Sequence, residues 1–166
     1  MTAAVIITGC PGAGKTSVLA ALASHLERDG VAFSALETEQ LAWGAPWLWG
    51  PPWLAQVAAV LAIQRAAGRR LFLLTATIES AEDLDAFREA VGTDRIMVVL
   101  LEVDPEVASA RIAAREPDHW VGKAYLVDAA RRLAVSIPRA LRDVDHRLAG
   151  DTRDPLDLAA EIARRI

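Results

Sequence analysis

The chain has 166 residues, of which 53% are hydrophobic and 24% are charged. This length is enough for one domain with its own core, and the single cysteine cannot form an internal disulfide. A net charge of -4 argues against an extended basic nucleic-acid surface and against binding to an anionic membrane.

The longest apolar segments are interrupted by glycine, proline or charge before they reach the length of a membrane span. The first residues lead directly into an apolar strand pattern and carry no basic leader. We therefore expect one cytoplasmic domain over residues 1–166 that binds neither nucleic acid nor membrane. We expect it to be a monomer or a homodimer.

The first predicted elements are a buried strand from Ala3 to Thr8 and a helix from Lys15 to Asp29. Between them the chain matches the whole P-loop pattern G-x-x-x-x-G-K-S/T. The residues of this expected nucleotide site are Gly9, Cys10, Pro11, Gly12, Ala13, Gly14, Lys15, Thr16 and Ser17.

The glycines of this loop allow consecutive main-chain N–H groups to point at phosphate oxygens. The N-terminus of the following helix adds a positive potential at the same place. Lys15 is expected to bridge the β- and γ-phosphates, and Thr16 to place its hydroxyl on Mg²⁺. The loop thus predicts that the chain binds ATP and Mg²⁺.

A second predicted strand, from Ala32 to Leu36, is followed by two carboxylates, Glu37 and Glu39. A carboxylate at the carboxyl end of a strand beside a P-loop can hold an attacking hydroxyl in line with the γ-phosphate. The alternative is that both are solvated loop residues.

Four of the five tryptophans come next, in a segment interrupted by glycine and proline that predicts a shaped loop. We expect residues 37–60 to form the acceptor region, whose walls suit a flat or apolar alcohol. The expected acceptor residues are Glu37, Glu39, Trp43, Trp47, Trp53, Thr75 and Thr77. The alternative is that the tryptophans close a core or a dimer interface.

Helical and strand patterns alternate through the rest of the chain, which predicts a parallel sheet covered on both faces, an α/β fold. The predicted helices are Trp53 to Ala67, a helix capped by Ser80 to Val91, Pro105 to Arg115, Tyr125 to Arg142 with a bend near Pro138, and a last helix from Pro155 to the C-terminus. The predicted strands are Arg70 to Ala76, Ile96 to Val103 and His146 to Ala149.

These features resemble the small P-loop kinases of metabolites, such as shikimate kinase, gluconate kinase, adenylylsulfate kinase and chloramphenicol phosphotransferase. The resemblance implies a three-layer αβα fold with a five-stranded sheet of order 2-3-1-4-5 and a small helical lid near residues 114–124. Glu37-Thr38-Glu39 is similar to the D-x-D element of shikimate kinase. There one carboxylate helps to organise Mg²⁺ and the other orients the acceptor hydroxyl, and the residues alone do not assign these roles to Glu37 and Glu39.

The sequence Arg111-Ile-Ala-Ala-Arg115 is similar to the R-x-x-x-R element at the lid of nucleoside and nucleotide kinases. Four residues apart on a helix, the two guanidinium groups share one face. The resemblance implies that Arg111 stacks on adenine and that Arg115 contacts the γ-phosphate. Lys123 is a further candidate for phosphate contact when the lid closes. The alternative is that the two arginines solvate a helix face.

The segment Arg153-Asp154-Pro155 resembles the loop that holds the adenine edge in these kinases. Many kinases of this class also carry an Asp at the end of strand three, where this chain continues from Ala76 with Thr77-Ile78-Glu79. Mg²⁺ is therefore expected on Thr16 with Glu37, or with Glu79, or on Thr16 and the phosphates alone.

Together the sequence predicts an ATP-dependent phosphotransferase that acts on a hydroxyl of a nucleoside or a natural-product-like alcohol. Lys15, Arg115 and Mg²⁺ neutralise charge on the γ-phosphoryl group, while Glu39, or failing it Glu37, aligns the acceptor. The first alternative is a nucleotide-binding regulatory protein or slow ATPase that uses the tryptophan-rich surface for a partner. The second is a nucleoside monophosphate kinase.

Overall fold

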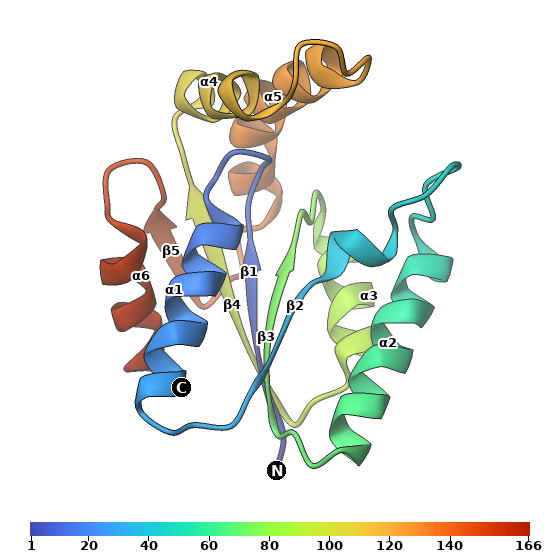
Figure 1. Cartoon of the computed structure of the whole chain (residues 1–166), viewed down its shortest axis with the longest axis vertical. Coiled ribbons are helices and arrows are strands. Elements are labelled where there is room, and N and C mark those ends of the chain that lie inside the picture. The colour runs from blue at the N-terminus through green and yellow to red at the C-terminus, as the bar shows by residue number, and fades with distance from the viewer.

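The computed structural model describes all 166 residues as one parallel sheet with helices on both sides (Figure 1). The strands are β1 (Ala3–Thr8), β2 (Ser34–Glu37), β3 (Leu71–Ala76), β4 (Arg95–Glu102) and β5 (His146–Ala149). All neighbouring pairs are parallel, and their order is β2-β3-β1-β4-β5. This confirms the predicted α/β class and the order 2-3-1-4-5.

The helices form one layer on each side of the sheet and a further pair above it. They are α1 (Lys15–Arg28), the short helix η1 (Thr38–Leu41), α2 (Pro51–Ala66), α3 (Ala81–Val91), α4 (Pro105–Arg115), α5 (Lys123–Ala140) and α6 (Pro155–Ala163). In Figure 1, α1 and α6 lie on one side of the sheet and α2 and α3 on the other. The α4–α5 hairpin stands above the carboxyl ends of the strands.

The core lies on both faces of the central strands. Every residue of β3 is buried, and so are all but the first residue of β1. Helices cover both faces of these strands, so their sequences are continuous apolar runs without the alternation of a half-exposed strand. The edge strand β2 is only half-buried. Rigid, buried strands therefore end directly beneath the loops that carry the candidate site.

The elements match the predicted ones, with small differences at their ends. Helix α2 begins at Pro51, two residues earlier than predicted, because proline fits the first helical turn, where no N–H donor is required. Strand β2 extends to Glu37, which pairs with Thr75 of β3. Helix α5 spans Lys123–Ala140 with Pro138 inside it, and α6 ends at Ala163 instead of the C-terminus.

No helix of the structure combines the length and the apolar character needed to cross a membrane.

Candidate active site

The P-loop between β1 and α1 has a backbone shape that requires glycine at three positions. Gly9, Gly12 and Gly14 have φ values of 145°, 82° and 95°, which L side chains rarely adopt. A Cβ on Gly9 would lie 2.6 Å from the carbonyl oxygen of Leu101. A Cβ on Gly12 would lie 2.5 Å from the carbonyl oxygen of Ala108. The loop is thus packed tightly against the end of β4 and against α4.

This loop presents main-chain donors that no protein group satisfies. The N–H groups of Gly12, Gly14, Lys15, Thr16 and Ser17 donate no hydrogen bond to the protein, and α1 has no side-chain cap at its N-terminus. Unpaired N–H groups at the start of a helix form a binding site for an anion. The donor set therefore fits the phosphates of a nucleotide.

The side chain of Lys15 is held at the base of the loop. Its Nζ donates to the carbonyl oxygens of Gly9 at 2.9 Å and Cys10 at 3.3 Å, and to Thr77 Oγ1 at 2.8 Å. Burial lowers the pKa of Lys15, and the nearby carboxylate of Glu39 opposes this shift. A bound phosphate would supply the full counter-charge that these neutral oxygens lack.

The two carboxylates that follow β2 contact different parts of the site. Thr16 Oγ1 donates to Glu37 Oε2 at 2.7 Å. Glu39 Oε1 accepts from the N–H of Thr77 at 3.1 Å, at the end of β3. The structure thus brings Glu37 to the hydroxyl of Thr16, and Glu39 to Thr77, which also contacts Lys15. Glu79, the other carboxylate considered for Mg²⁺, is exposed and makes no hydrogen bond.

Thr77 makes a contact that the sequence patterns did not indicate. Its hydroxyl accepts from Lys15 and its N–H donates to Glu39, so it links the nucleotide lysine to the acceptor carboxylate. Thr75, the other threonine predicted to line the acceptor region, is buried within β3 with only 1% of its surface exposed. Of the two, only Thr77 lies among the polar groups of the site.

Arg111 connects two loops at the nucleotide side. Its Nη1 donates to the carbonyl oxygens of Gly12 at 3.1 Å and Gly150 at 3.0 Å. Gly150 follows β5, and a Cβ there would lie 2.5 Å from the carbonyl oxygen of Ala13. The structure therefore places Arg111 at the junction of the P-loop and the β5–α6 loop. Its predicted stacking on adenine remains a prediction.

Within the β5–α6 loop, the predicted adenine residues contact α6. Arg153 pairs with Glu161 at 2.7 Å. The carboxylate of Asp154 accepts from the N–H of Leu156 at 2.7 Å and so caps α6, and Pro155 is the first residue of that helix. The side chains of Arg153 and Asp154 therefore stabilise the loop itself in this structure.

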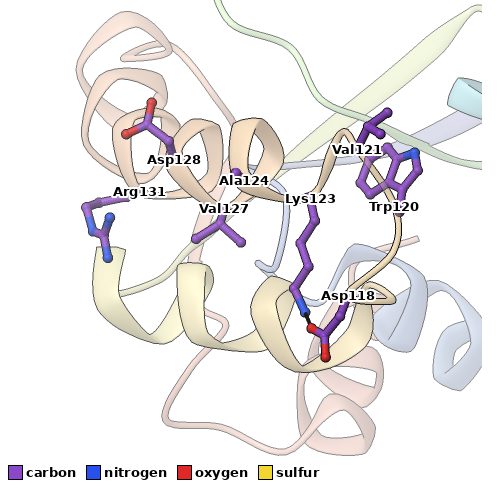
Figure 2. Close-up of a pocket in the computed structure, with 8 residues that line it drawn as sticks. All are labelled: Asp118, Trp120, Val121, Lys123, Ala124, Val127, Asp128 and Arg131. Atoms are coloured by element: carbon purple, nitrogen blue, oxygen red, sulfur yellow. Dashed lines mark hydrogen bonds and ion pairs between the residues drawn. The ribbon is translucent and has the colours of Figure 1, made fainter.

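The remaining predicted cations flank the turn between α4 and α5, residues 116–122. Arg115 pairs with Glu116 at 2.6 Å and Lys123 with Asp118 at 2.7 Å. Figure 2 shows the Lys123–Asp118 pair beside a cavity of about 460 Å³ in this part of the molecule. The cavity is lined by Asp118, Trp120, Val121, Lys123, Ala124, Val127, Asp128 and Arg131. No P-loop residue lines this cavity. In this structure Arg115 and Lys123 are therefore held by Glu116 and Asp118.

The tryptophans that follow η1 form a stacked series, which we call the tryptophan ladder (Trp43, Trp47, Trp49 and Trp53). Trp53 is buried, its Nε1 donates to the carbonyl oxygen of Thr38 at 2.8 Å, and its ring lies 5.2 Å from that of Phe87. Trp53 thus belongs mainly to the core, which differs from the acceptor wall predicted for it. Trp43 and Trp47 are exposed, and Trp49 joins them although it was not among the predicted site residues.

Three solved structures with the same fold are a sugar kinase, an APS kinase and a shikimate kinase. A sugar kinase from Janibacter sp. HTCC2649 has a TM-score of 0.72 and 17% identity, covering 99% of this chain and 94% of that chain. The APS kinase of Mycobacterium tuberculosis, solved with AMPPNP and APS, has a TM-score of 0.70 and 19% identity, covering 98% and 96%. A shikimate kinase from Acinetobacter baumannii, solved with shikimate, has a TM-score of 0.61 and 18% identity, covering 99% and 93%.

Among curated proteins, none matches the chain. The AAA domain family matches residues 5–135, which include the P-loop, both carboxylates after β2, the tryptophan ladder and the α4–α5 turn. This chain is a member of the AAA domain family, and its fold is the P-loop fold that the small-molecule kinases share.

Proposed function

We propose that the protein is an ATP-dependent phosphotransferase that acts on a hydroxyl group of a small molecule. The observation that carries this proposal is the pair of contacts made by two consecutive P-loop residues. Lys15 contacts Thr77 after β3, and Thr16 contacts Glu37 at the end of β2. These contacts support a position of the γ-phosphate beside the two strand ends that border the predicted acceptor region.

The residues present fit a magnesium nucleotide. Thr16 and Glu37 offer two oxygen ligands to Mg²⁺, which commonly keeps several waters and takes the rest of its ligands from phosphates. When bound, Mg²⁺ supplies positive charge that neutralises the β- and γ-phosphates.

The acceptor hydroxyl is aligned by Glu39 in this proposal. The acceptor oxygen forms a bond to the γ-phosphorus while the bond from that phosphorus to the bridging oxygen of ADP breaks. The hydroxyl proton passes to the Glu39 carboxylate. Lys15 compensates the negative charge on the transferred group, and Arg115 and Lys123 join it after they leave Glu116 and Asp118.

Three of the similar kinases support a hydroxyl acceptor and ATP as the donor. Sugars and shikimate, the molecules named for two of the similar kinases, carry hydroxyl groups, and the APS kinase was solved with the ATP analogue AMPPNP. In this chain the acceptor region is formed by the segment after β2. Its exposed tryptophans favour a nucleoside or a natural-product-like alcohol over a bare sugar acid.

A nucleotide-binding regulator or slow ATPase is the second candidate, because three exposed tryptophans could also contact a protein partner. A nucleoside monophosphate kinase is disfavoured, because residues 37–64 contain no arginine or lysine to hold a second phosphate.

A coupled assay of ADP release tests the proposal. With MgATP and a panel of alcohols, the parent should release ADP only when a suitable acceptor is present. Glu39→Gln should lower kcat about a hundredfold or more, since it removes the aligning carboxylate, and Lys15→Ala should abolish turnover. Arg131→Met, which changes a surface ion pair with Glu106, is the matched control and should keep the parent rate. ADP release that is independent of every acceptor would instead support the slow ATPase.

A further inference from the structure

The exposed part of the tryptophan ladder is a series of nearly parallel aromatic faces. The ring planes of Trp43 and Trp47 differ by 9° with centroids 6.3 Å apart, and those of Trp47 and Trp49 differ by 12° with centroids 5.5 Å apart. Their exposed fractions are 70%, 48% and 49%. Contiguous exposed aromatic surface of this kind marks a binding surface.

The buried end of the ladder is fixed beside the proposed catalytic carboxylates. Trp49 meets Trp53 edge to face, with centroids 5.5 Å apart and planes at 77°. Trp53 in turn donates to the carbonyl oxygen of Thr38, which lies between Glu37 and Glu39 in the chain. The η1–α2 loop that carries the ladder rises at the same end of the sheet as the α4–α5 hairpin (Figure 1). The ladder therefore runs outward from Trp53, beside the segment that carries Glu37 and Glu39, to the exposed ring of Trp43.

The two segments on this side of the site, which end before Arg65 and Arg88, carry only negative charge, and Arg88 pairs with Asp85 at 3.2 Å. Residues 37–64 and 77–87 contain no Lys, Arg or His. Their charged side chains are the carboxylates Glu37, Glu39, Glu79, Glu82, Asp83 and Asp85. Glu79, Glu82 and Asp83 are exposed.

Two cations of other elements act on these carboxylates, and both already have contacts. Lys15 is held by the P-loop carbonyls and Thr77. Arg132 of α5 bonds Asp128 at 2.9 Å, and this bond raises the pKa of Arg132, with weaker contributions from Tyr125 and Glu79. Apart from Lys15, which we assign to the nucleotide phosphates, a carboxylate or phosphate on the acceptor would therefore meet mainly like charge at this wall.

We propose that the acceptor is a hydroxyl-bearing organic cation, an alkylammonium or guanidinium compound, whose positive group lies on the exposed faces of the tryptophan ladder. This inference rests on the proposed phosphotransferase function and names its substrate class. The electron-rich face of indole binds cations more strongly than any other aromatic side chain does. The surrounding carboxylates add attraction at longer range.

A matched pair of probes tests the preference for positive charge. The first probe is benzyl(2-hydroxyethyl)dimethylammonium, and the second is its neutral analogue with carbon in place of the charged nitrogen. Binding is followed by tryptophan fluorescence in the absence of nucleotide, and turnover by ADP release with MgATP. The ammonium probe should bind about tenfold more tightly than its neutral analogue. A benzyl alcohol that carries a carboxylate should bind more weakly than either.

Three variants locate the preference. Trp47→Leu keeps an apolar side chain but removes an aromatic face, so it should bring the ratio of the two affinities close to one, while Trp47→Phe should retain part of it. Glu79→Gln should lower the ratio about twofold to threefold at low salt. Ile63→Ala on the exposed side of α2 and Glu27→Gln on α1 are controls and should leave the ratio unchanged.

The outcomes separate this inference from the proposed function. Equal affinities for the two probes, tighter binding of the carboxylate, or no binding of any probe, in a protein that still binds MgATP, would overturn the cationic acceptor and leave the phosphotransferase proposal standing. Loss of MgATP binding would overturn the phosphotransferase proposal. The preference of the ladder for the ammonium probe is still measured in that case, because the titration contains no nucleotide.

Discussion

Lys15 is the residue whose environment is most unusual in this protein. Its ammonium group is buried among neutral oxygens, and this burial lowers its pKa from the ordinary value of 10.5. The folded protein therefore holds this proton less tightly than the unfolded chain does. The charged side chain costs folding free energy below the lowered pKa, and the cost disappears as the pH rises from that pKa towards 10.5.

The lowered pKa of Lys15 predicts how Lys15→Met changes the stability of the protein with pH. The difference in unfolding free energy between the parent and the variant should shift in favour of the parent as the pH rises from neutral towards the ordinary lysine pKa. Urea unfolding of both proteins across this range measures the difference. Both should carry Cys10→Ala, because burial raises the pKa of that thiol and Lys15 affects it. A difference that does not change with pH would contradict the burial of a charged lysine.

At the scale of single residues, the sequence predicted what is local and missed what depends on neighbouring strands. The P-loop is a continuous segment, so its glycines, Lys15 and Thr16 could be identified from their spacing. Thr16 and Glu37 were expected together as one of the options for Mg²⁺, but their direct hydrogen bond depends on the parallel pairing of β1, β3 and β2, which no spacing reveals. The same pairing brings Thr77 to Lys15, so its link to the lysine could not be predicted.

At the scale of elements, helices and strands followed from apolar periodicity and capping residues. Ser80 caps α3, as its position before the helix predicted, and Asp104 caps α4. The tryptophan ladder was different. Glycine and proline predicted a loop, but the stacking of three indoles and the burial of the fourth arise from packing against η1 and α3. Composition could place the tryptophans near the site without telling the core residue from the exposed ones.

Because Trp53 is buried and Trp43 is exposed, replacing each by alanine should affect stability very differently. Trp53→Ala should lower the unfolding free energy by about 3–5 kcal/mol, because it removes a buried aromatic ring and its hydrogen bond to Thr38. Trp43→Ala should change it by about 0.5 kcal/mol or less, because Trp43 is mostly exposed. Urea unfolding followed by circular dichroism measures both. Equal losses in the two variants would show that the ladder is stabilised as one unit.

At the scale of the whole molecule, the candidate site is a meeting point of loops that are distant in the chain. Arg111 of α4 bonds Gly12 of the P-loop and Gly150 after β5. Asp151 accepts from the N–H of Asp104, the residue before α4, at 2.8 Å. The α4–α5 hairpin is therefore connected to both loops of the proposed nucleotide site. A ligand that orders the P-loop should therefore also stabilise the hairpin through these bonds.

This connection predicts a coupling between nucleotide binding and global stability. MgATP at about a hundred times its Kd should stabilise the parent by about 2.7 kcal/mol, which corresponds to a rise in Tm of about 5–10 °C for a domain of this size. Arg111→Met should weaken MgATP binding about tenfold or more, because Gly12 and Gly150 lose their shared charged donor. At the same MgATP concentration, the rise in Tm should then fall by about half, because the stabilisation depends on the logarithm of concentration over Kd.

The control is Arg131→Met, which replaces an exposed arginine of α5 that pairs with Glu106, and it should keep the full rise. If Arg111→Met also kept the full rise, the two loops would hold the nucleotide without their bridge, and the hairpin would be independent of the nucleotide site.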